Sequence, residues 1–221
     1  MENGALLRED GMLCYSEHGN VTELFPKTDI KIPGMHNVEN YLTAIAAVWG
    51  EVSVEVIHSI AKNFGGVEHR IELVRELDGV KWDNDSIAKS PTRTIAGLSC
   101  FDRKVILIGG GYDKHIPYEP LAPHLINKVK LLILSGPTAP KIAAALQSDP
   151  NYNGEPEIIF VNSMEEAVAT AYGYAEEGDI VTLSPASASF DLYPNFEVRG
   201  KLYKELVNKL GELDGIPASE L

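Results

Sequence analysis

Short apolar runs alternate with longer amphipathic runs from residue 71 to about residue 210. The apolar runs have the length of strands and lie at 71–76, 81–84, 104–108, 131–134, 157–161 and 180–183. Helical periodicity lies near 91–98, 118–127, 139–147, 164–176 and 201–210. Successive strands that are separated by helices pair in parallel, and the helices pack on the sheet. The sequence therefore predicts an α/β fold with a Rossmann-like, mainly parallel sheet and helices on both faces.

The first 66 residues have a different organisation. Turn-forming residues and alternating apolar positions over 11–32 predict two or three short strands, and helical periodicity follows at 38–49 and 53–63. Gly65 and Gly66 break this pattern and predict a hinge. A segment of this length buries too little surface to be comfortably stable by itself. We therefore predict two domains, a carboxyl-terminal remnant of a larger domain at 1–66 and a second domain at 67–221.

Charge and cysteine content exclude several classes of protein. The formal net charge of −13 disfavours a general nucleic-acid binder and a protein of anionic membrane surfaces. Cys14 and Cys100 lack a CxxC spacing, so neither a disulfide framework nor a zinc site is expected. The sequence has no apolar run of about 20 residues and no basic segment followed by an apolar one at its start. We expect a cytoplasmic protein that acts as a monomer.

Two polar clusters in the first half of the chain have the composition of anion-binding sites. In the segment PGMHNVEN, Asn37 is a good N-cap for a helix that begins at Val38, and Asn40 follows three residues later. The simpler interpretation is a capped helix with His36 in a loop, and the spacing alone favours it. In the segment FGGVEHRIE, Arg70 has a donor fork suited to phosphate, but it could equally pair with a neighbouring glutamate.

Three further clusters follow predicted strands. Asp85 could accept a ribose hydroxyl or lie near a metal-bound phosphate, although aspartate in such a position most often bonds its own backbone. In IGGGYDK, the glycines allow close approach of a ligand and Lys114 offers a charge for a carboxylate or phosphate. A tight turn with a solvated lysine is the favoured interpretation of that segment alone, and the GxxxxGK[ST] phosphate-binding motif is absent from the sequence. The segment 183–200 predicts a strand-to-helix loop, where open α/β sheets place their ligands.

Together, the segments PGMHNVEN, FGGVEHRIE, WDNDSIA, IGGGYDK and SPASASFDLYPNFEVRG resemble the carboxyl-terminal half of a Mur ligase, in the branch of that family that adds D-glutamate in peptidoglycan synthesis. The resemblance covers residues 11–210. It implies an ATP-dependent, ADP-forming ligase in which a carboxylate of UDP-N-acetylmuramoyl-L-alanine becomes an acyl phosphate and the amine of D-glutamate attacks it. ATP and Mg²⁺ are the implied cofactors, with the metal ligands and the phosphate-binding lysine upstream of this sequence. The domain at 1–66 would then be a remnant of the central ATPase domain, and the chain alone is expected to be inactive.

The resemblance also implies a role for each matching residue. The implied ATP contacts are His36, Asn37, Asn40, Arg70 and Asp85. The implied D-glutamate contacts are Lys114, Ser189, Asn195 and Phe196. Arg70 and Lys114 would act on the reacting groups. No metal ligand is implied within the chain.

The sequence departs from the family pattern after the aspartate-serine pair. Ile87 and Lys89 stand where many members carry lysine and threonine, and Lys89, Ser90 or Arg93 could supply the missing contacts. Two alternatives remain open from the sequence. One is a stand-alone Rossmann-like module that binds a nucleotide or metabolite, and the other is a related ligase such as another Mur enzyme or a folylpolyglutamate synthase.

Overall fold

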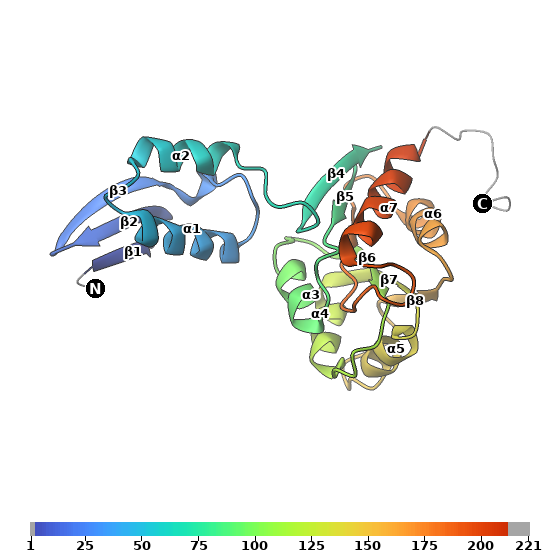
Figure 1. The fold of residues 1–221 in the computed structure, drawn as a ribbon. Coiled ribbons are helices and arrows are strands. Elements are labelled where there is room, and N and C mark those ends of the chain that lie inside the picture. Colours follow the sequence, from blue (N-terminus) through green and yellow to red (C-terminus); the bar gives the residue numbers. More distant parts are fainter. Residues whose placement is uncertain (1–2, 212–221) are drawn as a thin grey trace. The chain divides into compact units, whose positions relative to one another are not determined.

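The computed structural model describes residues 3–211, which form two compact units (Figure 1). Unit 1 is Met1–Gly66 and unit 2 is Val67–Leu221. No helix within residues 3–211 is long and apolar enough to cross a membrane.

Unit 1 is a three-stranded antiparallel sheet with two helices. Its elements are β1 (Asn3–Leu7), β2 (Met12–Glu17), β3 (Asn20–Pro26), the 3₁₀ turn η1 (Lys27–Asp29), α1 (Met35–Val48) and α2 (Val54–Asn63). Leu13 and Phe25 are paired across β2 and β3 and pack against Ile45 of α1 and Ile57 of α2. The two helices therefore bury one face of the sheet.

Two details of unit 1 differ from the sequence prediction. Strand β1 was not predicted, because it is short and contains a glycine at positive φ. Helix α1 begins at Met35 with Gly34 as its N-cap, so the prediction that Asn37 caps a helix starting at Val38 is wrong. Asn37 instead lies in the first turn of α1, and its amide donates to the carbonyl oxygen of Pro33 at 2.6 Å.

Unit 2 contains a six-stranded sheet in the order β4-β5-β9-β6-β7-β8. The strands are β4 (Glu72–Leu77), β5 (Val80–Asn84), β6 (Val105–Gly110), β7 (Val129–Ser135), β8 (Glu157–Phe160) and β9 (Ile180–Leu183). The helical elements are α3 (Pro91–Leu98), η2 (Glu119–Leu121), α4 (Ala122–Lys128), α5 (Ala139–Gln147), α6 (Met164–Tyr174) and α7 (Phe196–Lys209). Only β4 is antiparallel to its neighbour among these strands, which confirms the predicted mainly parallel sheet.

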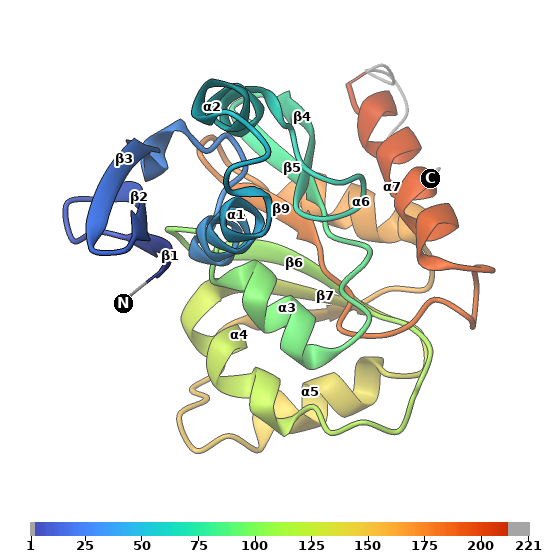
Figure 2. The same cartoon turned by 60° about the vertical axis from the view of Figure 1, so that its left-hand side comes forward.

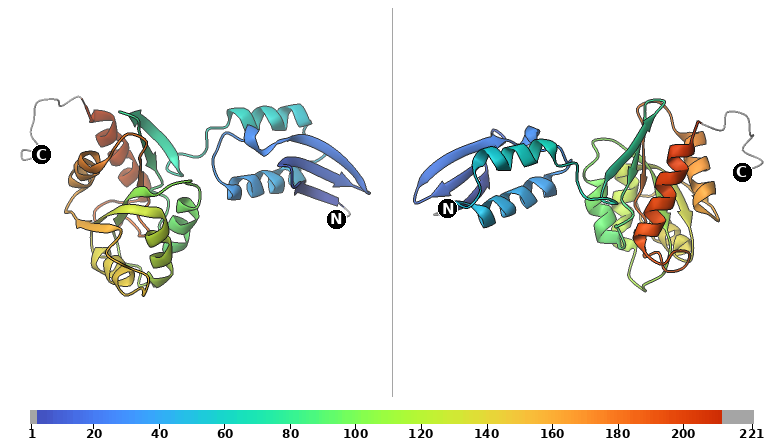
Figure 3. Two further views of the ribbon diagram at one scale, coloured as in Figure 1. Left: turned by 180° about the vertical axis from the view of Figure 1, so that it is seen from behind. Right: turned by 45° about the horizontal axis from the view of Figure 1, so that its top comes forward.

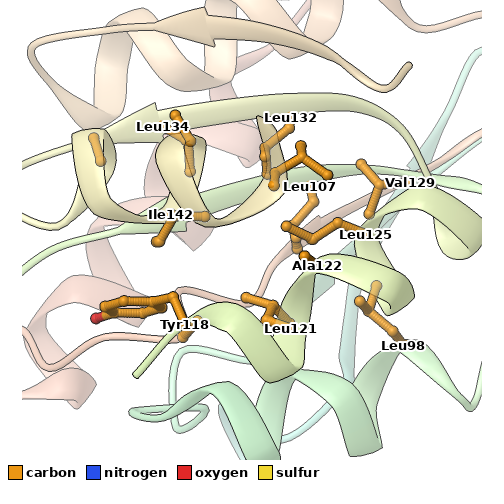
Figure 4. Close-up of a cluster of buried hydrophobic side chains, with 14 of the residues drawn as sticks. Leu98, Leu107, Tyr118, Leu121, Ala122, Leu125, Val129, Leu132, Leu134 and Ile142 are labelled. Atoms are coloured by element: carbon orange, nitrogen blue, oxygen red, sulfur yellow. The ribbon is translucent and has the colours of Figure 1, made fainter. Parts of the chain in front are cut away.

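Side-chain alternation along the strands explains why helices cover both faces of this sheet. Leu107 of β6 and Leu132 of β7 face α3, α4 and α5, in the core drawn in Figure 4. Ile106 and Ile108 of β6 point the other way, toward α6 and α7. The right-handed rule for parallel crossovers places α4 and α5 on one face, and it places α6 on the other because the chain then returns across the sheet to β9. Figures 2 and 3 show this division.

Helix α7 begins earlier than the sequence predicted. We expected a helix at 201–210, but it starts at Phe196, directly after its N-cap Asn195. The side-chain oxygen of Asn195 accepts the backbone N–H of Val198 at 2.9 Å. The strand-to-helix loop therefore covers 184–195, and Phe196 lies in the helix.

Candidate functional site

The sheet of unit 2 reverses its strand order between β6 and β9. From β6 the chain continues outward through β7 and β8, and it then returns to place β9 on the other side of β6. In open α/β sheets, ligands bind outside the carboxyl ends of the strands at such a reversal. The loops that follow β6 and β9 are therefore the first place to look for a site.

The loop after β6 depends on its glycines. A Cβ on Gly110, at φ 99°, would lie 2.0 Å from the carbonyl oxygen of Ser135, and one on Gly111 would lie 2.4 Å from that of Ala188. No larger residue fits at either position. Directly after them, the N–H of Tyr112 donates to the carbonyl oxygen of Ala188 at 2.9 Å. This bridge places the segment that carries Lys114 beside the segment that carries Ser189.

Lys114 is exposed, and no described side chain forms an ion pair with it. Its neighbour Asp113 is already occupied, because Lys141 and His115 lie beside its carboxylate. The Lys141 ammonium, with the N–H of His115, holds the pKa of Asp113 below its usual range. A free cation therefore stands at the carboxyl end of β6, available to an anionic group.

Arg199 holds the loop after β9 in place through hydrogen bonds from its buried side chain. Its side chain is 3% exposed and donates to the carbonyl oxygens of Ser187, Ala188 and Ser86 and to the hydroxyl of Ser86. Burial lowers the pKa of the guanidinium to about 10, so it stays charged near neutrality. A cation that is solvated by four oxygens of two loops holds those loops in one arrangement. The sequence motifs did not indicate a role for Arg199, although its spacing from the buried Tyr203 and Val207 places all three on one helical face.

Hydroxyl groups complete the anchoring of this loop. The hydroxyl of Ser187 lies 2.8 Å from that of Tyr118 and 2.8 Å from that of Thr138. Ser189 is 1% exposed, and its carbonyl oxygen accepts the N–H of Tyr193 at 2.8 Å. The loop is therefore held by hydrogen bonds within itself and to Tyr118 and Thr138.

Phe196 lies where this loop joins α7. Its ring is half-buried, with the ammonium of Lys89 4.8 Å from the ring centroid. Its carbonyl oxygen accepts the hydroxyl of Ser86 at 2.8 Å. Lys89, one of the residues that depart from the family pattern, thus brings a second cation beside the start of α7.

Asp85 follows β5 and is buried. It is 4% exposed, and its carboxylate accepts the hydroxyl of Ser184 at 2.8 Å. Burial raises the pKa of Asp85 to about 7, although the Ser184 hydroxyl and the charges of Arg70 and Arg93 oppose the rise. A Cβ on Gly97 of α3 would come within 2.7 Å of this carboxylate. The structure therefore places Asp85 under α3, with its carboxylate turned inward.

Arg70 is exposed, and the glutamates that could have paired with it have another partner. Lys204 of α7 donates to Glu68 at 3.2 Å and to Glu72. The alternative that Arg70 pairs with a neighbouring glutamate is therefore wrong. Its guanidinium remains available and lies near enough to Asp85 to lower the pKa of that carboxyl.

The remaining sequence-predicted site residues belong to unit 1. His36, Asn37 and Asn40 all lie in the first two turns of α1. The Asn40 amide donates to the side-chain oxygen of Asn37 at 3.3 Å. The two asparagines therefore form one local cluster at the start of that helix.

One group within residues 3–211 has the spacing of a metal site. Ligand atoms of Glu68, His69 and Glu72 lie within 4.8 Å of one another. Lys204 already places its ammonium between the two carboxylates. Mg²⁺ takes oxygen ligands and keeps several waters, so this lysine-filled group does not fit the magnesium that the resemblance implies.

A family model and named relatives match the sequence of this chain. The family model described as Mur ligase, glutamate ligase domain, matches residues 69–187. The UDP-N-acetylmuramoylalanine–D-glutamate ligase of Acetivibrio thermocellus is 54% identical over 213 residues, which are 95% of this chain and 46% of the relative. The enzyme of the same name from Clostridium beijerinckii is 54% identical over 210 residues, which are 95% of this chain and 43% of the relative. The chain therefore spans less than half the length of these curated relatives.

Solved structures agree in fold. A murein peptide ligase from Psychrobacter arcticus has a TM-score of 0.60 at 21% identity, over 97% of this chain and 45% of the other. A folylpolyglutamate synthase from Mycobacterium tuberculosis has a TM-score of 0.59 at 13% identity, over 90% of this chain and 46% of the other. At such identities the likeness concerns the fold alone.

Proposed function

We propose that this chain, which belongs to the Mur ligase family, is the amino-acid-binding part of an ATP-dependent ligase. The ligase would join D-glutamate to UDP-N-acetylmuramoyl-L-alanine and form ADP and phosphate. The relatives named for that reaction share about half of their matched residues with this chain. Unit 2 would bind D-glutamate, and unit 1 would be the last part of the ATPase domain. The reaction would take place in the cytoplasm, with the protein as a monomer.

The observation that carries this proposal is the free Lys114 on the loop after β6, at the reversal of the sheet. D-glutamate has two carboxylates, and a cation without an acidic partner is what one of them needs. The Tyr112–Ala188 bridge sets Lys114 beside the loop of Ser189. Asn195 and Phe196, at the end of that loop, would complete the contacts to the amino acid, and Lys89 would replace the threonine that the family pattern has there.

The chemistry divides between binding and charge stabilisation. ATP would supply the phosphoryl group that turns the nucleotide-linked substrate carboxylate into an acyl phosphate. The amine of D-glutamate would attack that carbon, so that a C–N bond forms, the C–O bond to phosphate breaks and the amine loses a proton. Arg70 would stabilise charge on the transferred phosphoryl group, and His36, Asn37 and Asn40 would contact the nucleotide. The resemblance also implies a ribose contact for Asp85, but its buried carboxylate is bonded to the Ser184 hydroxyl and turned inward, which does not favour that role. Unit 2 would contribute by holding the amine in the attacking orientation.

Phosphate release by the full-length ligase that contains this chain tests the proposal. The reaction holds UDP-N-acetylmuramoyl-L-alanine, ATP and Mg²⁺, and the added amino acid is D-glutamate, L-glutamate or L-lysine. We expect turnover with D-glutamate only, and no turnover by residues 1–221 alone. Turnover with another amino acid, or with a folate substrate and L-glutamate, would overturn the proposal.

A further inference from the structure

The turn that carries Arg70 has an unusual backbone. His69 has φ of 66° and Ile71 has φ of 47°, on either side of Arg70. Positive φ is uncommon outside glycine and is a genuine outlier for a β-branched residue such as isoleucine. Strain of this kind persists only where the surroundings hold it. Here the N–H of His69 donates to Glu72 at 2.9 Å, and the N–H of Ile71 is bonded to the Asp85 carboxylate.

The imidazole of His69 is also held, and its tautomer follows from its partner. The ring is 3% exposed, and its Nδ1 lies 2.8 Å from the side-chain nitrogen of Asn84. The Asn84 oxygen accepts the N–H of Ser86 at 3.1 Å, so the amide nitrogen must be the end that faces the ring. His69 Nδ1 therefore accepts, and the proton of the neutral ring lies on Nε2.

Helix α7 supplies the surface against which this ring packs. A Cβ on Gly200 would lie 2.3 Å from His69 Nδ1, and the Phe196 ring meets the imidazole edge-on at a centroid distance of 5.9 Å. Glycine inside a helix costs stability, so its presence at this contact reflects the closeness of the ring. Lys204, four residues further along α7, bonds Glu68 and Glu72 beside the same turn. Positions 196, 200 and 204 thus form a helical stripe that faces the Arg70 turn.

We infer that His69 is a positioning residue. Its imidazole packs against Gly200, and this contact fixes the orientation of the Arg70 side chain relative to α7. The first turn of α7 follows the loop that we propose binds D-glutamate, so the same helix would align the amino-acid loop and the nucleotide arginine. This inference rests on the proposed function for the role of Arg70. The contact itself does not.

Paired variants of His69 in the full-length ligase separate positioning from general stability. His69→Asn keeps a hydrogen-bond acceptor near Nδ1 and a side chain that tolerates positive φ, whereas His69→Leu keeps only the approximate size. We expect His69→Leu to lower kcat/KM for ATP by about 100-fold, as misplacement of a catalytic group does, and His69→Asn to keep most of the activity. In the Arg70→Ala background, His69→Leu should cost nothing more. The inference would be overturned if the losses of kcat/KM from His69→Leu and Arg70→Ala multiplied in the double variant. Equal losses in His69→Asn and His69→Leu would also overturn it.

The contact with Gly200 has a spectroscopic test that needs no turnover. Imidazole ¹⁵N shifts of residues 1–221 should show the Nε2–H tautomer for His69. Gly200→Ala should move these shifts, while Gly173→Ala, a helical glycine of α6 with open space around it, should leave them unchanged. An Nδ1–H tautomer, or unchanged shifts in Gly200→Ala, would refute the contact. If the ligase has no turnover with D-glutamate, the proposed function fails while this measurement still decides the contact.

Discussion

Buried charge is the feature that most distinguishes individual residues in unit 2. Arg199 is a buried cation whose partners are loop oxygens, and no described carboxylate pairs with it. Asp85 is a buried acid whose partners are a hydroxyl and a backbone N–H. Burying a charge is costly unless hydrogen bonds replace its water. The hydrogen bonds of both residues offset part of this cost and hold loops of the candidate site in place.

Asp85 should make the stability of unit 2 depend on pH. Burial raises its pKa from 3.8 to about 7, so between these values the folded chain holds a proton that the unfolded chain has lost. Stability from this group should therefore be full below the lower value and fall as pH rises to the upper one. Asp85→Asn keeps the shape without the charge. We expect its free energy of unfolding, relative to the original chain, to rise by roughly 2–4 kcal/mol between pH 5 and pH 8.

Denaturant unfolding checks this expectation. The chain has two tryptophans, so a Trp49→Phe background leaves Trp82 to report on unit 2. Asp83 also has a raised pKa, of about 6, and its contribution is the same in both proteins being compared. A difference that stays constant from pH 5 to pH 8 would mean that Asp85 is not held as a buried acid.

Sequence patterns could predict where the loops lie but not whether each side chain in them is buried or which group it bonds. Lys114 was predictable as a ligand candidate, because glycines after a strand and a following lysine have a direct physical meaning. Lys114 has no acidic partner because Asp113 pairs with Lys141 instead, and Lys141 lies in α5, further along the chain. The partners of Arg199 and Asp85 lie up to 113 residues away along the chain, so no local pattern predicted which oxygens these side chains would bond.

Helix α7 connects the parts of the candidate site. One stripe of this helix, at 199, 203 and 207, is buried against the sheet and the loops. The stripe at 196, 200 and 204 faces the turn of Arg70. The prediction that the helix starts at 201 was wrong because the loop ends at Asn195 and not at Gly200. Pro194 is the second-last loop residue and Asn195 is the N-cap, so the first turn of the helix begins at Phe196.

Asn195 has two possible roles, which substitutions can separate. Asn195→Ala should destabilise unit 2 by about 1 kcal/mol because the cap is lost. Asn195→Asp keeps the cap and adds a favourable negative charge at the helix N-terminus. If Asn195 also contacts D-glutamate, the aspartate variant should be as stable as the original chain but have a raised KM for D-glutamate, because two carboxylates would then repel each other.

The control for this experiment is Ser163→Ala, which removes the cap of α6. It should cost similar stability and leave the KM for D-glutamate unchanged in the full-length ligase. An Asn195→Asp variant with an unaltered KM would show that Asn195 is a cap and nothing more.

The larger architecture was the most predictable part of the chain. Alternating strands and helices determined the parallel sheet, and the handedness of crossovers determined which helices share a face. The function was less predictable than the architecture, because the chain spans under half the length of its curated relatives. In the proposed function, the loops of unit 2 bind the amino acid, while a phosphate-binding GxxxxGK[ST] motif is absent from the sequence. We therefore propose that unit 2 recognises the amino acid and that the phosphoryl chemistry needs the longer protein that the curated relatives represent.

Steady-state kinetics of Lys114→Ala in the full-length ligase test this assignment most directly. Loss of a charge-assisted hydrogen bond is worth about 1.5–3 kcal/mol, so the KM for D-glutamate should rise by about 10- to 100-fold while the KM for ATP stays within about twofold. Lys104→Ala is the matched control, because Lys104 is an exposed lysine at the opposite end of β6, and it should change neither constant. An unchanged KM for D-glutamate in Lys114→Ala would contradict the placement of the amino acid at the carboxyl end of this sheet.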